Sequence, residues 1–158
     1  MATKRKGVLG PYSGKSCIVT READYALRCI LYLSDDEKAH RSVREISSEM
    51  HIPESFLAKI LQRLMKAGVV ASVRGAGGGF KLSKPASEIT VLGVMEAIDG
   101  PLVINRCAVE PGSCDLSGEC VIHPLWVILK SELERRFEKL NFKDLAAKRR
   151  SGQRKKEA

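Results

Sequence analysis

The feature that most constrains the fold is a glycine-rich segment at residues 74–79, Arg-Gly-Ala-Gly-Gly-Gly, with short β-prone runs on both sides. Residues 69–73 and 80–82 favour two strands, and the glycines between them favour a turn. Glycine adopts backbone conformations that side chains forbid and lets other molecules approach the backbone closely. The segment therefore predicts a β-hairpin with an open tip that carries Arg74.

Two short helices are expected immediately before this hairpin. Ser42 and Glu45 form a Ser-x-x-Glu capping box that opens the first helix, which continues to Met50. Pro53 suits the start of the second helix, and Gly68 suits the position just after its end. Two short helices joined by a tight turn and followed by a hairpin are typical of a winged helix-turn-helix. The predicted fold class is therefore mainly α with a small β-hairpin wing.

Three more helices complete the predicted architecture. The first begins after Thr20, which is a suitable N-cap, and ends near Leu33. Another spans 90–99, and the last and longest spans about 124–140. Little of the chain remains to cover the apolar stripe of that last helix, so we expect it to pair with a second copy as a dimerisation helix. The stripe consists of Trp126, Leu129, Leu133, Phe137 and Leu140.

Positive charge is concentrated in three places. The chain has a net charge of +8, of which residues 1–16 carry +4 and residues 143–158 carry +5, so the body between them is nearly neutral. Within that body, residues 55–87 contain no acid and six basic residues: Lys59, Arg63, Lys66, Arg74, Lys81 and Lys84. Such a local excess on the second short helix and the hairpin indicates double-stranded DNA as the partner.

Several other classes of protein are disfavoured. No apolar run approaches the roughly 20 residues of a membrane span, and no secretory signal opens the chain, so we expect a cytoplasmic protein without a membrane partner. Nucleophile elbows, phosphate loops and paired acids are also missing from the sequence, so we do not expect an enzyme. A small iron–sulfur electron carrier and an adaptor that binds through its long helix are the alternatives, and salt-sensitive DNA binding distinguishes a DNA-binding protein from both.

The chain has five cysteines, and three of them lie within fourteen residues. Cys29 falls on an apolar helical stretch and is interpreted as packing material. Cys107, Cys114 and Cys120 are separated by six and five residues, and His123 follows three positions later as a candidate fourth ligand. Thiolate ligands suit zinc or an iron–sulfur cluster.

Four interpretations of these cysteines stay open. Structural zinc sites usually contain short Cys-x-x-Cys knuckles, and here only Cys120 and His123 have that spacing, so the residues favour a cluster over zinc. A redox thiol pair, such as Cys107 with Cys114, is the third interpretation. The fourth is that the cysteines have no role.

The chain resembles the bacterial winged-helix iron–sulfur regulators typified by IscR, NsrR and RirA, over about residues 18–145. Four segments carry the resemblance: Thr-Arg-Glu-Ala-Asp-Tyr-Ala-Leu-Arg at 20–28, Ile-Pro-Glu-Ser-Phe-Leu at 52–57, Val-Arg-Gly-Ala-Gly-Gly-Gly-Phe at 73–80, and the three cysteines followed by His-Pro-Leu-Trp at 123–126. The resemblance implies a transcriptional regulator that binds a roughly palindromic operator as a homodimer. It also implies an iron–sulfur cluster that senses iron or cluster supply, nitric oxide or redox state.

Members of this family differ in cluster type and fourth ligand. IscR-like members hold a 2Fe–2S cluster with the residue equivalent to His123, which is the assignment we favour here. NsrR-like members hold a 4Fe–4S cluster with an aspartate at the place of Asp24, supplied across the dimer. Two departures stand out: the first cysteine gap is six residues where cluster-binding relatives usually have five, and Ala58 replaces a glutamate that reads bases in some relatives. A thiol- or zinc-based regulator of the same fold is the alternative.

The DNA contacts are expected on the second helix of the helix-turn-helix and on the wing. The helix should enter the major groove, where lysines contact phosphate and Gln or Arg reach base edges. Arg74 at the wing tip resembles the arginine that family members insert into the minor groove. The predicted contacts are Ser55, Lys59, Gln62, Arg63, Arg74, Gly75 and Lys81.

These expectations divide the chain into four regions. Residues 1–16 are a disordered basic arm, and 17–87 are the winged helix-turn-helix DNA-binding domain. Residues 88–142 hold the cluster-binding loop and dimerisation helices, and 143–158 form a basic flexible tail.

Overall fold

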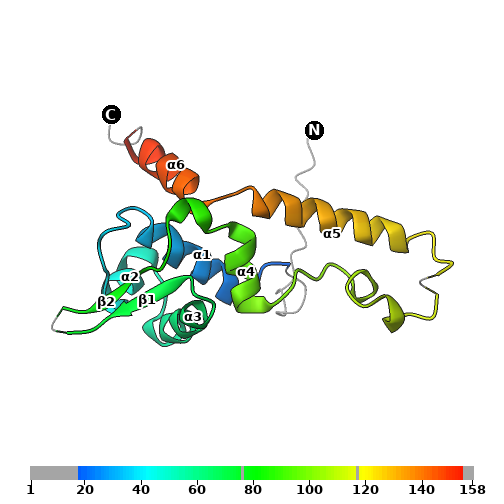
Figure 1. The fold of residues 1–158 in the computed structure, drawn as a ribbon, viewed down its shortest axis with the longest axis horizontal. Coiled ribbons are helices and arrows are strands. Elements are labelled where there is room, and N and C mark those ends of the chain that lie inside the picture. The colour runs from blue at the N-terminus through cyan, green and yellow to red at the C-terminus, as the bar shows by residue number, and fades with distance from the viewer. Residues whose placement is uncertain (1–17, 76, 117, 155–158) are drawn as a thin grey trace, which may run out of the picture.

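The computed structural model describes residues 18–75, 77–116 and 118–154, and this part is mainly α-helical with one hairpin (Figure 1). Its main elements are α1 (Arg21–Leu33), α2 (Val43–Met50), α3 (Glu54–Lys66), β1 (Val70–Val73), β2 (Gly79–Leu82), α4 (Val91–Asp99), α5 (His123–Glu138) and α6 (Phe142–Arg154). Short 3-10 helices lie between them at η1 (Ala86–Glu88), η2 (Arg106–Ala108) and η3 (Pro111–Ser113). The predicted fold class is confirmed. The predicted arm at 1–16 lies outside the described residues.

Thr20 and Ser42 are the N-caps of the first two helices, as predicted, whereas the carboxylate of Glu45 in the expected capping box accepts from Tyr32 and Arg41. The Thr20 hydroxyl accepts a hydrogen bond from the Ala23 amide at 3.1 Å, and the Ser42 hydroxyl accepts one from the Glu45 amide at 3.2 Å. Both bonds satisfy amides that the first turn of a helix leaves unpaired. Between α2 and α3, His51 has a left-handed backbone (φ 53°), and this residue turns the chain from one helix to the next.

Helix α1 lies at the centre of the hydrophobic core and packs against α2, α3, α4 and α6. The side chains buried from α3 and α4 recur at helical spacing: Leu57, Ile60, Leu61, Leu64, Val91, Val94, Met95 and Ile98. Cys29 is fully buried on α1, and this burial raises the pKa of its thiol to about 12 because the thiolate is poorly solvated. The interpretation of Cys29 as packing material is confirmed.

The wing is an antiparallel hairpin in which Val70 pairs with Leu82 and Val73 pairs with Gly79. A third segment joins it. The amide of Arg41 donates to the Phe80 carbonyl at 2.9 Å, and the amide of Phe80 donates back at 2.8 Å. The loop before α2 is therefore attached to the outer edge of the wing, a contact that the sequence did not indicate.

The basic segment from Lys143, predicted as a flexible tail, is instead helical up to Arg154, and residues 155–158 lie outside the described part. Phe142, at the start of α6, is buried in the core. Arg149 forms an ion pair with Asp35 at 2.7 Å and lies over the Tyr32 ring. These contacts with residues far away in the sequence stabilise α6, for which the polar sequence alone did not predict a buried apolar face.

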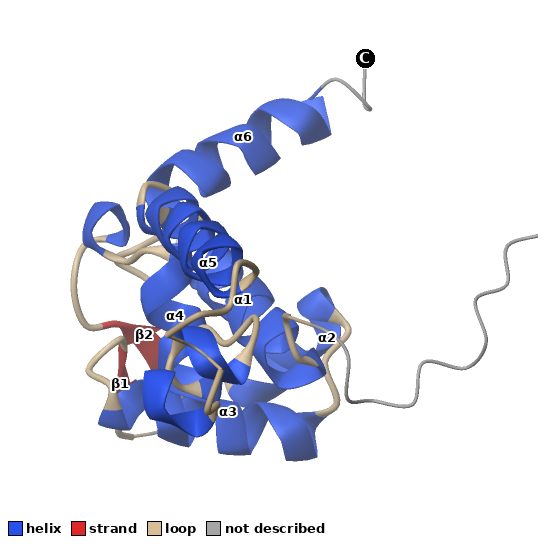
Figure 2. Ribbon diagram, turned by 90° about the vertical axis from the view of Figure 1, so that its right-hand side faces the viewer, coloured by secondary structure: helices blue, strands red, loops and turns tan. Residues whose placement is uncertain are grey.

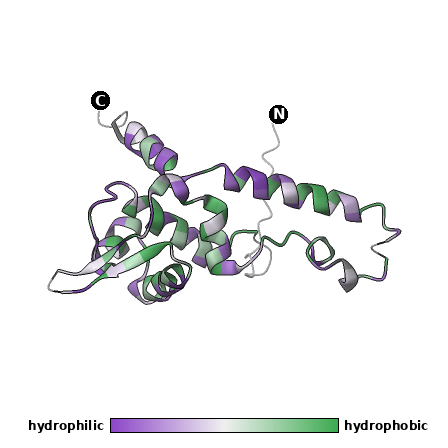
Figure 3. Ribbon diagram, in the orientation of Figure 1, coloured by the Kyte–Doolittle hydropathy of each residue, from purple (hydrophilic) through white to green (hydrophobic). Residues whose placement is uncertain are grey.

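Helix α5 extends away from the core alongside the segment that precedes it (Figure 1). No residue of α5 is classed as buried. Leu125, Val127 and Ile128 are 49%, 40% and 56% exposed, and Figure 3 shows the hydrophobic residues of α5 concentrated in the half nearer its N-terminus. Leu133 and Phe137, in the other half, pack against the core. The apolar N-terminal half is thus uncovered in the single chain.

Candidate DNA-binding surface and cysteine segment

Helix α3 presents a polar face to solvent. Ser55, Lys59, Gln62 and Lys66 are all exposed and recur at intervals of four, three and four residues. This spacing places them on one side of the helix, whereas Leu57 and its buried neighbours lie on the other. Figures 1 and 2 show α3 and the wing on the side of the molecule opposite α6.

The wing carries two further exposed cationic side chains. Arg74 directly follows β1, Lys81 lies on β2, and both are exposed. The amide of Gly78 donates to the Gly75 carbonyl at 2.9 Å, and Gly75 has a φ of 116°, so the tip is a tight turn that requires glycine. We call Ser55, Lys59, Gln62, Lys66, Arg74, Gly75 and Lys81 the basic surface.

His40 is a neighbour of the wing that sequence reasoning missed. Its Nε2 lies 2.8 Å from the carbonyl oxygen of Gly77, so the imidazole N–H donates to the tip of the hairpin. The two residues are 37 positions apart, and nothing in the local pattern around His40 pairs it with the wing.

Arg63 was predicted as a DNA contact, but in the structure its side chain bonds to other parts of the protein. Its Nη1 lies 2.7 Å from Glu22 Oε2 on α1 and donates to the Ile98 carbonyl on α4 at 3.2 Å. Arg63 is half exposed, but its guanidinium is directed towards α1 and α4. The sequence gave no signal of this because Glu22 lies 41 residues away.

The three clustered cysteines lie in residues 101–122, here called the cysteine segment. Cys107 lies on η2, which packs against α5, and Cys114 follows η3. Cys120 lies in the turn before α5, where the amide of His123 donates to the Cys120 carbonyl at 3.2 Å. Cys120 and His123 therefore share one turn at the start of α5.

The donor atoms present suit a metal or cluster, although the structure does not assemble them. In the described ranges, no three His, Cys, Asp or Glu side chains are grouped to hold a metal ion, whether with His123 or with Asp24. The buried Nδ1 of His123 has no hydrogen-bond partner among the described residues. A buried polar atom without a partner costs about 1–3 kcal/mol, and ligation would satisfy it. Asp24 is already paired with Arg28 at 2.7 Å.

The cysteine segment also carries exposed hydrophobic side chains. Leu116, Val121 and Ile122 are exposed on the cysteine segment, next to the uncovered half of α5. In the part of the chain that the structure describes, no helix is both long and apolar enough to span a bilayer. The exposed apolar residues of α5 and of the cysteine segment are uncovered in the single chain.

Comparison with known proteins places the chain in one family. The model of the Rrf2 family, described as an iron-dependent transcriptional regulator, matches residues 19–148. The chain is 35% identical over 116 residues to the HTH-type transcriptional regulator IscR of Cronobacter sakazakii, an alignment covering 73% of this chain and 71% of that protein.

Solved structures with the same fold include two named regulators. T. potens IscR superposes with a TM-score of 0.71 at 22% identity, covering 85% of this chain and 90% of that one. CymR, the global cysteine regulator of B. subtilis, superposes with a TM-score of 0.65 at 21% identity, covering 82% and 95%. At these identities the superpositions show a shared fold.

Proposed function

Because this chain belongs to the Rrf2 family of transcriptional regulators, we propose that it binds operator DNA as a homodimer whose DNA affinity is controlled by an iron–sulfur cluster. Its relatives are regulators and not enzymes, as the sequence predicted. The observation that carries the DNA-binding part is the basic surface, whose exposed side chains belong to α3 and the wing.

The parts of the basic surface have different roles in this proposal. Helix α3 enters the major groove, where Lys59 and Lys66 contact phosphates and Gln62 and Ser55 reach base edges. Ala58 is exposed between them and has no polar group with which to read a base. Arg74 enters the minor groove, because the glycines beside it leave the tip narrow enough for a close approach.

A second copy of the chain is the partner we propose for α5. Its uncovered apolar half carries Leu125, Val127 and Ile128, and Val121 and Ile122 are exposed directly before it in the chain. Two-fold pairing of this surface presents two copies of α3 to DNA, as required for a palindromic operator with half-sites about 34 Å apart.

Cys107, Cys114, Cys120 and His123 are the residues that we propose as ligands. The thiolates supply the sulfur ligands that an iron–sulfur cluster needs, and the unpartnered Nδ1 of His123 supplies the nitrogen. When bound, such a cluster supplies a centre that is sensitive to iron supply, nitric oxide and redox state. We expect residues 101–122 to become ordered when these ligands are engaged, and this segment connects α4, which packs on the DNA-binding domain, to the dimerisation helix α5.

The experiment is an operator titration with protein purified anaerobically. Binding sites are selected from random double-stranded DNA, and affinity is measured by fluorescence anisotropy at several salt concentrations. We expect affinity to fall steeply with salt, and to differ at least tenfold between cluster-loaded and chelator-treated protein for the selected site. If binding is salt-sensitive but cluster-loaded and chelator-treated protein have equal affinities, the protein binds DNA without control by a cluster. If the purified protein is colourless and contains stoichiometric zinc, the site binds zinc and not an iron–sulfur cluster.

The fourth ligand is tested by two single substitutions, His123→Ala and Asp24→Ala. We expect His123→Ala to change the absorption and Mössbauer spectra of the reconstituted protein and to shorten the lifetime of the cluster. Asp24→Ala is the matched comparison and should leave both spectra unchanged, because Asp24 is paired with Arg28 on its own helix. The reverse pattern would assign the ligand to Asp24.

A further inference from the structure

Arg63 connects three helices at one point, here called the junction. Its guanidinium pairs with Glu22 in the first turn of α1 and donates to the carbonyl of Ile98 in the last turn of α4. The carbonyls at the end of a helix have no partner within it and carry partial negative charge. A cation from α3 therefore caps the end of α4.

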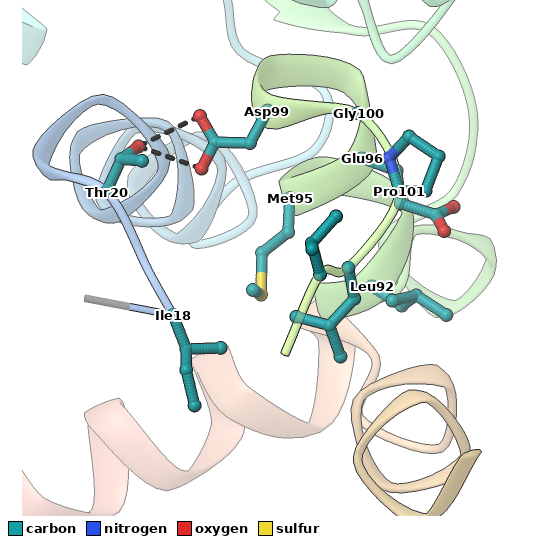
Figure 4. Close-up of a pocket in the computed structure, with 10 residues that line it drawn as sticks. Ile18, Thr20, Leu92, Met95, Glu96, Asp99, Gly100 and Pro101 are labelled. Atoms are coloured by element: carbon teal, nitrogen blue, oxygen red, sulfur yellow. Dashed lines mark hydrogen bonds between the residues drawn. The ribbon is translucent and has the colours of Figure 1, made fainter. Parts of the chain in front are cut away.

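The same end of α4 is also bonded to the N-cap residue of α1. The hydroxyl of Thr20 lies 2.9 and 2.8 Å from the two carboxylate oxygens of Asp99, the last residue of α4. Figure 4 shows Thr20 and Asp99 facing each other at a pocket of about 130 Å³. The lining of this pocket continues into Pro101, Leu102 and Val103, the first residues of the cysteine segment.

We propose that Arg63 is a positioning residue and not a DNA contact: it fixes the orientation of α3 relative to the end of α4, where the cysteine segment begins. This inference rests on the proposed DNA-binding function. The cysteine segment begins directly after Asp99 and Gly100, and Arg63 on α3 is bonded to the carbonyl of Ile98, the residue just before them. If α3 is held in its binding orientation for a smaller fraction of the time, the apparent operator affinity falls by that fraction.

The alternative is that Arg63 leaves Glu22 and contacts a phosphate. Half-exposed ion pairs contribute little to stability, so the 2.7 Å contact alone does not prevent such a movement. The two roles predict opposite effects for the partner residue. If Arg63 positions α3, removing the charge of Glu22 weakens binding, whereas if Arg63 contacts phosphate, removing that charge frees the guanidinium and strengthens binding.

The test is a double-mutant cycle with Glu22→Gln, Arg63→Gln and the double variant, measured on the selected operator over a range of salt. We expect each single variant to bind about threefold to fivefold more weakly, the double variant to bind no more weakly than either, and the salt slope to stay unchanged. Glu88→Gln, which removes an exposed acid on η1, is the charge-matched control and should not weaken binding.

Amide hydrogen exchange of the DNA-free protein gives a second measurement. The Gly100 amide donates to the Glu96 carbonyl at 3.0 Å at the end of α4, and we expect its exchange to accelerate in both single variants. A salt slope reduced by about one in Arg63→Gln, or unchanged or tighter binding in Glu22→Gln, would overturn the inference. So would an unchanged exchange rate. If the wild type does not bind DNA, the proposed function itself fails, and the inference fails with it.

Discussion

Replacing Gly79 with alanine is expected to lower the free energy of unfolding by about 2 kcal/mol, the scale of an overpacked site. A Cβ at this position would overlap the carbonyl oxygen of Arg41, which is backbone and lacks the freedom to rotate away. The paired backbone of Arg41 and Phe80 must then separate, and the wing loses its attachment to the loop before α2. Urea denaturation, followed by far-UV circular dichroism, measures the change.

Gly112→Ala is the matched control. Gly112 lies in the cysteine segment, and a Cβ built there has no atom within 4 Å, so its substitution should leave the denaturation midpoint nearly unchanged. Equal midpoints for Gly79→Ala and wild type would show that the backbone at Arg41 moves away from the added Cβ without a measurable loss of stability. A loss of stability in Gly79→Ala alone identifies crowding at the wing as the cause.

Arg74→Ala is expected to weaken operator binding more than tenfold, which corresponds to about 1.4 kcal/mol. Arg74 is exposed at the start of the wing tip and is followed by Gly75, which has no side chain to block its approach to DNA. A narrow minor groove concentrates negative potential and attracts an inserted arginine. The measurement is a fluorescence anisotropy titration of the selected operator at fixed salt.

Lys139→Ala controls for the loss of one positive charge. Lys139 is exposed just after α5, away from α3 and the wing, so its removal changes the net charge equally without touching the basic surface. We expect less than a twofold change in affinity from this variant. If Arg74→Ala has the same small effect, the wing does not belong to the DNA-binding surface.

Much of the fold was predictable because its signals are local. The capping interactions of Thr20 and Ser42 lie within three residues of the amides they bind, so a short sequence window contains both partners. The apolar period of α1, α3 and α4 likewise determined which faces are buried, including that of Cys29. The hairpin tip was predictable because a run of glycines suits few other structures.

The candidate site was predictable in its residue types but not in all of its contacts. The part of the basic surface on α3 follows from helical spacing, and Ser55, Lys59 and Gln62 are exposed on one face as predicted. Arg63 is a cation like Lys59 and follows Gln62 directly in the chain, yet its guanidinium bonds to α1 and α4. The three cysteines and His123 were chosen for their chemistry, and their assignment as ligands stays a prediction.

The sequence by itself determined the helix boundaries set by caps, the buried faces, the glycine tip and the set of soft donor atoms. Only the tertiary structure decided that Arg41 pairs with Phe80, that Arg63 caps α4, and that residues after Lys143 form a helix held by Asp35. The physical reason is the separation along the chain. Arg149 and Asp35 are 114 residues apart, so the free energy that stabilises α6 comes from contacts formed once α1 and the core have folded.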